Sequence, residues 1–206
     1  MMTTHNIGSR RTRGGAHFAP ALGGGSGANR SATAGRVNIT LLTDRLCLRP
    51  PEDRDFDRFA HFYASDRASA RGWHRDRNAA SQLFSEILAY WKSHGIGWFV
   101  LEKQISNTTI GMVGVWQPKG QPEPSLDWTI WHGCDEGQGL AFEAAQAARN
   151  FAFKSKKVST LVGYIHPENY RSISLAKRLG AYTDGRWLSP SGKNLTIYRH
   201  PKPEAH

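Results

Sequence analysis

The sequence predicts an α/β fold in which one mixed sheet packs against helices. Segments with helical periodicity interleave along the chain with segments of strand-like alternation, as in proteins that layer helices on a sheet. The chain has 206 residues, which is enough for one domain with a sizeable core. No internal repeat is visible. These three observations favour a single globular unit of the α/β class.

Periodicity and turn residues divide the chain into elements. Strands are identified by period-two alternation, as at Leu46 and Leu48, and helices by apolar residues three and four apart, as in residues 79–94. Ser106-Asn107 favours a hairpin turn, and three prolines exclude 117–124 from the interior of a strand. The expected strands are 41–50, 97–103, 109–116, 126–132, 160–165, 185–188 and 194–199, and the expected helices are 52–63, 79–94, 139–154 and 169–179.

The first 39 residues differ in composition from the rest. They hold glycine clusters, five arginines and no acidic residue, with few large apolar side chains. We expect residues 1–39 to be a disordered Gly/Arg-rich extension, because such a composition buries too little apolar surface to fold. A transit peptide or a mis-assigned start codon would explain the segment as well. Residues 201–206 are expected to be a tail, so the domain is predicted at 40–200.

The net charge of +10 is shared between the two parts of the chain. The five arginines of the extension supply half of it and leave +5 (10 − 5) for the rest. A modestly basic domain suits a polyanionic ligand, and it also suits weak attraction to nucleic acid. No run of about eighteen apolar residues occurs, so no membrane span is expected. Cys47 and Cys134 have neither metal-binding nor redox spacing, which favours a reduced, cytoplasmic protein without a metal.

A glycine-rich turn leads directly into the helix at 139–154. Gly137 and Gly139 lack a Cβ, so a phosphate can approach the amides of residues 138–141, at a helix end that the peptide dipoles make attractive for anions. The turn fits neither common nucleotide loop, because Phe142 occupies the third glycine position of G-x-G-x-x-G and no G-x-x-x-x-G-K-[ST] occurs. A plain strand-to-helix turn would explain the two glycines equally well.

Two motifs occur in a characteristic order. G-x-G-x-A-x-E-A spans Gly137–Ala144, and N-x-x-S-x-x-x-A-x-x-L-G spans Asn169–Gly180. With them the chain resembles the GNAT superfamily of acyl-CoA-dependent N-acetyltransferases, in particular the branch similar to the RimJ and RimL ribosomal-protein N-acetyltransferases. The likeness runs from about Leu41 to Gly185 and begins with a phrase similar to the family's T-x-R-L-x-L-R. It implies a single GNAT-like domain with a mixed, mostly antiparallel sheet of about six to seven strands and about four helices.

The resemblance implies an enzyme that moves an acetyl group from acetyl-CoA, its co-substrate, to a primary amine by direct attack in a ternary complex. The acceptor would be a small amine or a protein N-terminus, and the protein a monomer or homodimer; no metal, membrane or nucleic-acid partner is expected. Pantetheine would lie between strands 126–132 and 160–165, with backbone amides near Ile130 or Trp131 on the thioester oxygen. The implied cofactor-binding residues are Ile130, Trp131, His132, Gly137, Gln138, Gly139, Leu140, Ala141, Asn169 and Ser172.

The resemblance also suggests an acceptor wall and an acid. In the family the segment around 67–78 borders the acceptor, which would give Arg71, Trp73, His74 and Arg75 roles in substrate choice; a solvated loop with one packed tryptophan is the alternative. Trp128 is a further substrate-binding candidate. Ser172 would hydrogen-bond the departing thiolate. Asn169 either contacts the cofactor or simply caps the helix by accepting the Ser172 amide. Most other tryptophans, Trp98 included, are expected in the core.

The general base is the least defined part of the prediction. Related sequences often carry a glutamate two residues before a glycine on the strand that precedes the glycine loop, where this chain reads Ser125-Leu126-Asp127-Trp128. Asp127 and Glu123, and His132 through a water, are the available substitutes. The absent glutamate also favours a non-catalytic CoA-binding or regulatory domain. A third function, a nucleic-acid-associated module, would draw affinity from the arginine-rich extension and lose it steeply with salt.

Overall fold

The structure is a computed structural model that describes residues 39–156 and 158–203. Its centre is an eight-stranded sheet in the order β1-β2-β3-β4-β5-β6-β8-β7. All neighbouring strands are antiparallel except β5 and β6, which are parallel. The strands are β1 (Leu41–Leu42), β2 (Leu46–Arg49), β3 (Trp98–Lys103), β4 (Thr109–Trp116), β5 (Ser125–Ile130), β6 (Val162–Ile165), β7 (Tyr182–Leu188) and β8 (Asn194–Arg199), and the α-helices are α1 (Phe56–Tyr63), α2 (Asp66–Ser69), α3 (Arg77–His94), α4 (Leu140–Ser155) and α5 (Tyr170–Arg178).

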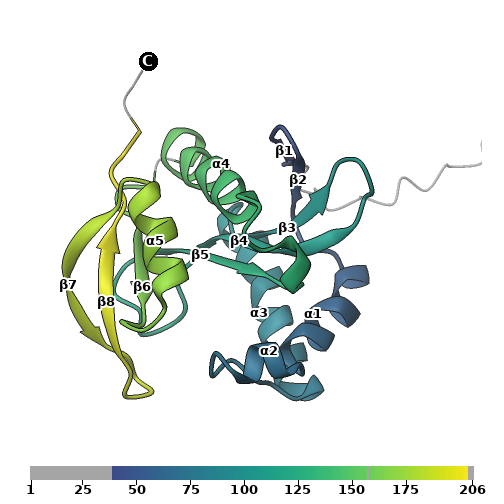
Figure 1. The fold of residues 1–206 in the computed structure, drawn as a ribbon, viewed down its shortest axis with the longest axis horizontal. Coiled ribbons are helices and arrows are strands. Elements are labelled where there is room, and N and C mark those ends of the chain that lie inside the picture. The colour runs from purple at the N-terminus through teal and green to yellow at the C-terminus, as the bar shows by residue number, and fades with distance from the viewer. Residues whose placement is uncertain (1–38, 157, 204–206) are drawn as a thin grey trace, which may run out of the picture. The chain divides into compact units, whose positions relative to one another are not determined.

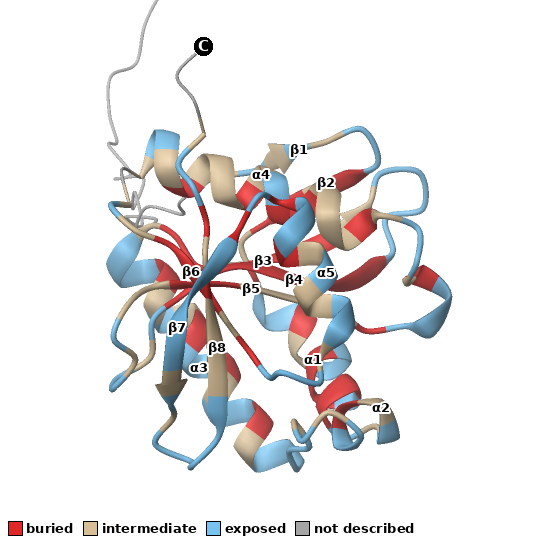
Figure 2. Ribbon diagram, turned by 60° about the vertical axis from the view of Figure 1, so that its left-hand side comes forward, coloured by how far each residue is buried: buried red, intermediate tan, exposed pale blue. Residues whose placement is uncertain are grey.

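Helices cover both faces of the sheet. In Figure 1, α4 lies above the central strands and α1, α2 and α3 lie below them, while α5 packs on β6. Burial is concentrated in the middle of the sheet, drawn red in Figure 2, and every residue of β4 is buried. Strand β7 is an exposed edge. The core therefore lies around β3, β4 and the near end of β5.

The prediction of an α/β class with a mixed, mostly antiparallel sheet is confirmed, but the predicted counts are slightly low. The described residues form eight strands and five α-helices instead of six to seven strands and about four helices. One strand is added because the Thr43 amide donates to the Leu46 carbonyl at 2.9 Å and folds the predicted first strand into the β1–β2 pair. One helix is added because α2 forms inside the predicted loop, where the Ser65 side chain accepts from the Ala68 amide.

The long helices begin and end at residues that the sequence marks. Asp76 caps the first turn of α3, and Gly95 ends that helix with a φ of 62°. Gly180 follows α5 with a φ of 82°, and the Ala181 amide donates to the Ala176 carbonyl at 3.0 Å. Glycine suits both stops because a Cβ disfavours positive φ.

The buried face of α4 consists mainly of alanine. Ala144, Ala145, Ala148 and Ala152 are buried, and α4 contacts both β4 and β5. Because these side chains are small, the helix axis can lie close to the strands. This close packing fixes the first turn of α4 beside the end of β5, where the glycine-rich turn precedes it.

Within residues 39–156 and 158–203, no helix is long and apolar enough to cross a membrane. Of the predicted extension at 1–39, only Ile39 is among the described residues, and residues 204–206 of the predicted tail are outside them as well. The boundaries of the extension and of the tail therefore stay predictions.

Candidate active site

The parallel strands β5 and β6 are paired at a single position. Ser125 lies opposite Val162, and no further pair joins the two strands, although β5 continues to Ile130 and β6 to Ile165. On their other sides, β5 remains paired with β4 and β6 with β8. The sheet is therefore split between its two halves beyond Ser125, with unpaired strand edges on each side of the split.

The split exposes backbone groups of β5. The Trp131 amide donates to the Ile110 carbonyl of β4 at 2.8 Å. Because the hydrogen-bonding direction alternates along an antiparallel strand, the amides of Trp128 and Ile130 point away from β4, toward the split. The predicted use of an amide near Ile130 on the thioester oxygen fits this geometry. The Trp131 amide does not fit it, because β4 already accepts its hydrogen bond.

Two cavities meet at the split. The first, here called the α4 cavity, has a volume of about 610 Å³ and extends to the glycine-rich turn and the first turn of α4. The second, here called the aromatic cavity, has a volume of about 920 Å³ and is lined from α1, α3 and the β7–β8 hairpin. The residues that line both cavities are Arg71, Trp73, Trp128, Thr129, Asn169 and Ser172.

The glycine-rich turn presents unpaired amides to the α4 cavity. Gly137 and Gly139 have φ values of 74° and 79°, and both line this cavity. A Cβ on Gly137 would meet nothing within 4 Å, so its positive φ, and not crowding, favours glycine there. The first bond of α4 runs from the Glu143 amide to the Gly139 carbonyl at 3.1 Å. The three preceding amides have no acceptor within the helix, which makes this end a suitable anion site.

Glu143 joins the start of α4 to the β1–β2 turn. It accepts hydrogen bonds from Thr43 Oγ1 at 2.6 Å and from Arg45 Nε at 2.7 Å. A second Arg45 nitrogen donates to the Gln138 carbonyl at 2.9 Å. Burial works against ionisation of Glu143, but the hydrogen bonds from Thr43 and Arg45 outweigh it and lower the pKa of this carboxyl. The opening phrase of the domain therefore holds the glycine motif in place.

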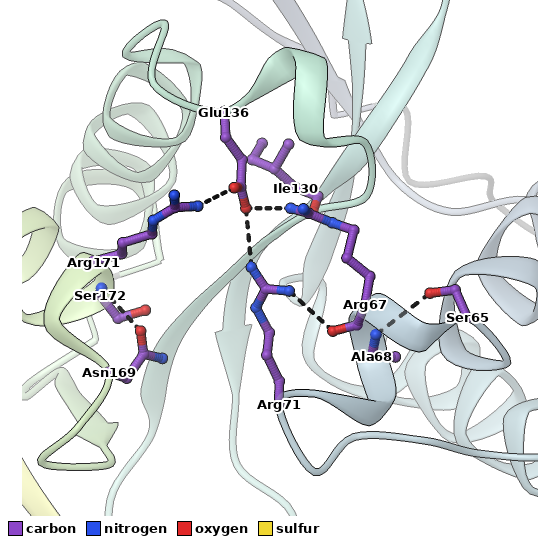
Figure 3. A network of polar contacts seen from close by, with 9 residues as sticks. All are labelled: Ser65, Arg67, Ala68, Arg71, Ile130, Glu136, Asn169, Arg171 and Ser172. Atoms are coloured by element: carbon purple, nitrogen blue, oxygen red, sulfur yellow. Dashed lines mark hydrogen bonds and ion pairs between the residues drawn. The ribbon is translucent and has the colours of Figure 1, made fainter.

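Three arginines converge on Glu136, the residue before Gly137 (Figure 3). Arg71 donates to its carboxylate at 3.1 Å, and Arg67 and Arg171 are bonded to the same group. Arg67 lies in α2, Arg71 in the following loop and Arg171 in the first turn of α5. This arginine cluster bridges the two sides of the split. Three positive charges against one negative charge leave the border of the α4 cavity electropositive.

Asp127 lines the aromatic cavity from β5. The Ser125 hydroxyl donates to Asp127 Oδ2 at 2.8 Å. Burial raises the pKa of Asp127 to about 6, although Ser125 and the indole of Trp98 both act to lower it. Within the described residues, Trp98 Nε1 has no hydrogen bond of normal geometry, so its effect is one of proximity. A carboxylate with this pKa is ionised at neutral pH and is a better proton acceptor than an ordinary aspartate.

Trp98 reaches the neighbourhood of Asp127 across Gly114. The strand register aligns Trp98 in β3, Gly114 in β4 and Asp127 in β5 in one row. A Cβ on Gly114 would lie 2.1 Å from the Gly97 carbonyl oxygen, so the close approach of β3 excludes a side chain there. The expectation that Trp98 is simply a core residue is incomplete, because it also lines the aromatic cavity.

The other two candidate bases line neither cavity. Glu123 forms a bidentate ion pair with Arg199, with N···O distances of 2.8 and 2.9 Å, and accepts a hydrogen bond from Thr160 at 2.7 Å. The bonds from Arg199 lower the pKa of Glu123 to about 2, which makes it a poor proton acceptor. His132 is exposed and lies two residues after the end of β5. The geometry therefore favours Asp127 over both.

Asn169 caps α5, as one of its two predicted roles requires. Its Oδ1 accepts from the Ser172 amide at 3.2 Å. Both side chains also line both cavities, so the cap and a ligand contact are compatible. Within the described part of the chain, the Ser172 hydroxyl makes no hydrogen bond, since only its backbone amide is used by the cap. The hydroxyl is therefore available at the split.

Most of the predicted cofactor residues gather at the α4 cavity, and three do not. Trp131, the residue after β5, is buried and stacks on Phe62 of α1, with ring centroids 6.2 Å apart. His132 and Gln138 are exposed, and the Gln138 side chain donates to the Cys134 carbonyl at 2.5 Å. The predicted substrate-binding residues Trp73, His74 and Trp128 line the aromatic cavity. The predicted cofactor residues that line the α4 cavity are Ile130, Gly137, Gly139, Leu140, Ala141, Asn169 and Ser172.

Comparison with known proteins defines the class of the protein. The family model described as an acetyltransferase (GNAT) domain matches residues 45–182, well over half of the chain. The chain therefore belongs to the GNAT acetyltransferase family. The match extends from the β1–β2 turn to the start of β7 and so includes the glycine-rich turn, the split and the arginine cluster.

Individual related proteins share moderate to low sequence identity with this chain. The [ribosomal protein uS5]-alanine N-acetyltransferase of Escherichia coli is 25% identical over 163 residues, which are 71% of this chain and 80% of that protein. An acetyltransferase structure from Agrobacterium tumefaciens is 34% identical with a TM-score of 0.73, and the match covers 82% of this chain and 100% of the other. The RimL ribosomal L7/L12 α-N-protein acetyltransferase, solved with coenzyme A, shares the fold at a TM-score of 0.64 and 11% identity, over 78% of this chain and 96% of the other.

Apart from Arg71, sequence reasoning missed the residues of the arginine cluster. It also missed several residues of the aromatic cavity, among them Tyr63, Trp98 and Lys193. These residues come from α1, β3 and the β7–β8 hairpin, and no motif connects them. One signal was available in the sequence. Gly114 stands inside an otherwise apolar strand, and such a glycine often marks a close approach beside a site.

Proposed function

We propose that this protein is an acetyl-CoA-dependent N-acetyltransferase that transfers the acetyl group directly to a primary amine in a ternary complex. The observation that carries this proposal is the meeting of the α4 cavity and the aromatic cavity at the β5–β6 split. Two reactants that enter from opposite sides would meet at this point without a covalent enzyme intermediate. Membership of the GNAT acetyltransferase family supports the same reaction class.

The α4 cavity suits the phosphates and the pantetheine arm of acetyl-CoA. The amides of Leu140 and Ala141 at the α4 N-terminus would receive the pyrophosphate, and the electropositive arginine cluster would add long-range attraction. The unpaired edge of β5 would bond the amide groups of pantetheine, much as a neighbouring strand would. A relative of the same fold, the RimL acetyltransferase, was solved with coenzyme A.

The chemistry requires one new bond and one broken bond. The neutral amine forms the N–C bond at the thioester carbonyl, and the C–S bond of the thioester then breaks. The Trp128 and Ile130 amides are directed at the split and would stabilise the oxyanion, where each such donor is typically worth roughly 3 to 4 kcal/mol. Asp127 would accept the proton that the amine loses, and Ser172 would donate a hydrogen bond or a proton to the leaving thiolate.

The acceptor would be a protein N-terminus or a small amine. The E. coli relative acts, by its name, on an alanine of ribosomal protein uS5, but at 25% identity this name does not define the acceptor of the present chain.

Cys47 and Cys134 are both free, which supports a cytoplasmic site of action.

Calorimetric titration of the full chain with acetyl-CoA tests the proposal first. Desulfo-CoA and ATP serve as controls at the same moderate salt concentration. We expect binding in the micromolar range that depends on the pantetheine arm, followed by acetyl transfer to amines detected by mass spectrometry. Absence of acetyl-CoA binding in a folded sample would remove the enzyme proposal, and binding without transfer to any amine would leave a non-catalytic CoA-binding domain.

A further inference from the structure

The wall of the aromatic cavity that the sheet forms is rich in aromatic side chains and carries a single acid. Indole rings from three different strands, those of Trp98, Trp116 and Trp128, line it together with the phenol of Tyr63. Asp127 is the one carboxylate among the lining residues of β3, β4, β5 and β6. Among the residues that the structure describes on this wall, Asp127 is therefore the counter-charge that an amine would meet, with aromatic surface around the carbon frame of the amine.

The mouth of the aromatic cavity carries the opposite charge. Arg75 lies after α2, and its backbone amide donates to the Tyr63 carbonyl at 3.0 Å, which fixes that residue beside the cavity. Lys193 lies in the β7–β8 turn, and its Nζ is 3.4 Å from the position of a Cβ on Gly72. Two segments more than a hundred residues apart in sequence thus place cations at one rim.

Arg75 and Lys193 form no ion pair with another described residue. Arg75 and Lys193 line the aromatic cavity only, whereas Arg71 borders both cavities and is bonded to Glu136. Among the residues that the structure describes, no carboxylate lies within ion-pair distance of Arg75 or Lys193. The acid at the rim, Glu168, is exposed and lies 4.0 Å from His166. The rim is therefore net positive in front of the aromatic wall of the cavity.

We infer that the acceptor is a primary amine on an apolar body that also bears a negatively charged group a few bonds beyond the nitrogen. This inference rests on the proposed acetyl transfer and narrows its acceptor. The amine would lie at Asp127, the apolar body between the indoles, and the anionic group at Arg75 and Lys193. A polyamine is disfavoured, because its second ammonium would face the two cations of the rim. A peptide with an apolar first residue and an early acidic residue fits the requirement.

The test uses the full chain, acetyl-CoA and matched tripeptide amides that begin with phenylalanine. Their second or third residue is glutamate, glutamine or arginine, so the reacting amine stays the same while the charge changes. We expect kcat/KM to be roughly 3- to 10-fold higher for the glutamate peptide than for the glutamine peptide, because two partly exposed ion pairs contribute about that much. The arginine peptide should have a lower kcat/KM than the glutamine peptide. The preference should shrink at 1 M salt, where screening is strong.

Reversing the charges of Arg75 and Lys193 tests whether these residues cause the preference for the glutamate peptides. The double variant Arg75→Glu, Lys193→Glu should invert the glutamate-to-arginine ratio of kcat/KM. The double variant Arg58→Glu, Lys154→Glu is the matched control, because it makes the same change at exposed helix positions that line neither cavity. The control should keep the wild-type ratio. A wild-type ratio near one, or a ratio that survives reversal at Arg75 and Lys193, would overturn the inference.

Binding of the same peptides separates this inference from the proposed function. Tryptophan fluorescence reports binding directly, because Trp98, Trp116 and Trp128 line the cavity. If no peptide is acetylated but the glutamate peptides bind more tightly than the arginine peptides, the acetyl-transfer proposal fails and the charge preference stands. If all peptides are acetylated and bound equally, the charge preference fails and the acetyl-transfer proposal stands.

Discussion

The hydroxyl of Ser125 donates a hydrogen bond to Oδ2 of Asp127 at 2.8 Å. Ser125 occupies the position at which related sequences often carry a glutamate, and Asp127 follows two residues later on the same face of β5. By that resemblance the carboxylate of this chain lies two positions further toward the split, and the small Ser125 side chain hydrogen-bonds it. This arrangement supports the proposal that Asp127 serves as the general base in place of the usual glutamate.

Replacing the proposed base should separate activity from stability. Asp127→Asn should lower kcat/KM by about 10²-fold or more, because general-base catalysis typically contributes that much. The wild-type rate should rise with pH through about 6, the pKa of Asp127, and the variant should lack this limb. Burial raises this pKa in the folded protein, so the wild type loses stability as the pH rises from about 4 to 6 and Asp127 ionises. The variant has no such charge, so its melting temperature at pH 8 should not be lower than that of the wild type. An unchanged pH–rate profile would exclude Asp127 as the base.

The proposed phosphate site at the glycine-rich turn can be tested with two side chains of the same shape and different charge. Gly139→Asp should weaken acetyl-CoA binding at least about 10-fold, because a carboxylate would lie at the proposed pyrophosphate site; this corresponds to about 1.4 kcal/mol. Gly139→Asn is the control, because asparagine has the same shape and also tolerates the positive φ of 79°. Equal affinities of the two variants, measured by calorimetry, would argue against a phosphate site at this turn.

If acetyl-CoA binds as proposed, Glu136 would compete with an incoming phosphate for its three arginines. Glu136→Gln should destabilise the fold, on the order of 1 to 3 kcal/mol for lost charged hydrogen bonds, while acetyl-CoA binds several-fold more tightly at low salt. The gain should vanish at 1 M salt because it is electrostatic. Weaker binding at low salt would mean that the carboxylate chiefly holds the arginines in place.

The Ser172 hydroxyl can be removed without removing the helix cap. Asn169 accepts from the backbone amide of Ser172, so Ser172→Ala should leave the melting temperature and the affinity for acetyl-CoA unchanged. If the hydroxyl assists the leaving thiolate, kcat should fall about 10-fold, at the low end of an acid–base contribution. Steady-state kinetics with an unchanged kcat would leave Ser172 as a helix-start residue only.

The buried His200 should make the folded protein less stable in acid. Burial, helped by the charge of Arg149, lowers the pKa of His200 to about 4, and only 3% of the residue is exposed. The unfolded chain takes up this proton near pH 6.5 and the folded chain only near 4, so stability falls as the pH drops through that window. The loss should be on the order of 2 to 3 kcal/mol. Chemical denaturation of His200→Leu from pH 7 to 4 should show a flatter dependence, and an equal slope would contradict the assignment.

Local sequence signals determined much of the fold. The alanine face and the glycine start of α4, the stop of α3 at Gly95 and that of α5 at Gly180 follow from periodicity and backbone preference, which act over a few residues. The same signals identified the glycine-rich turn and the Asn169 cap. The turn that divides the predicted first strand into β1 and β2 was missed, and so was the short helix α2. Each of these elements is too short to establish a period and depends on a single turn or cap.

Tertiary structure decided the chemistry. Glu123 and Asp127 lie four residues apart and look equally suitable in sequence, but folding brings Arg199 to Glu123 and leaves Asp127 half-buried near the indole of Trp98. Burial and a distant counter-charge shift the two pKa values in opposite directions, and neither effect is visible locally. The cations at Arg75 and Lys193 likewise share one rim only after the β7–β8 hairpin has folded back over the loop after α2. Composition and periodicity therefore gave the class of the fold, whereas long-range contacts selected the candidate base and the charge of the proposed acceptor.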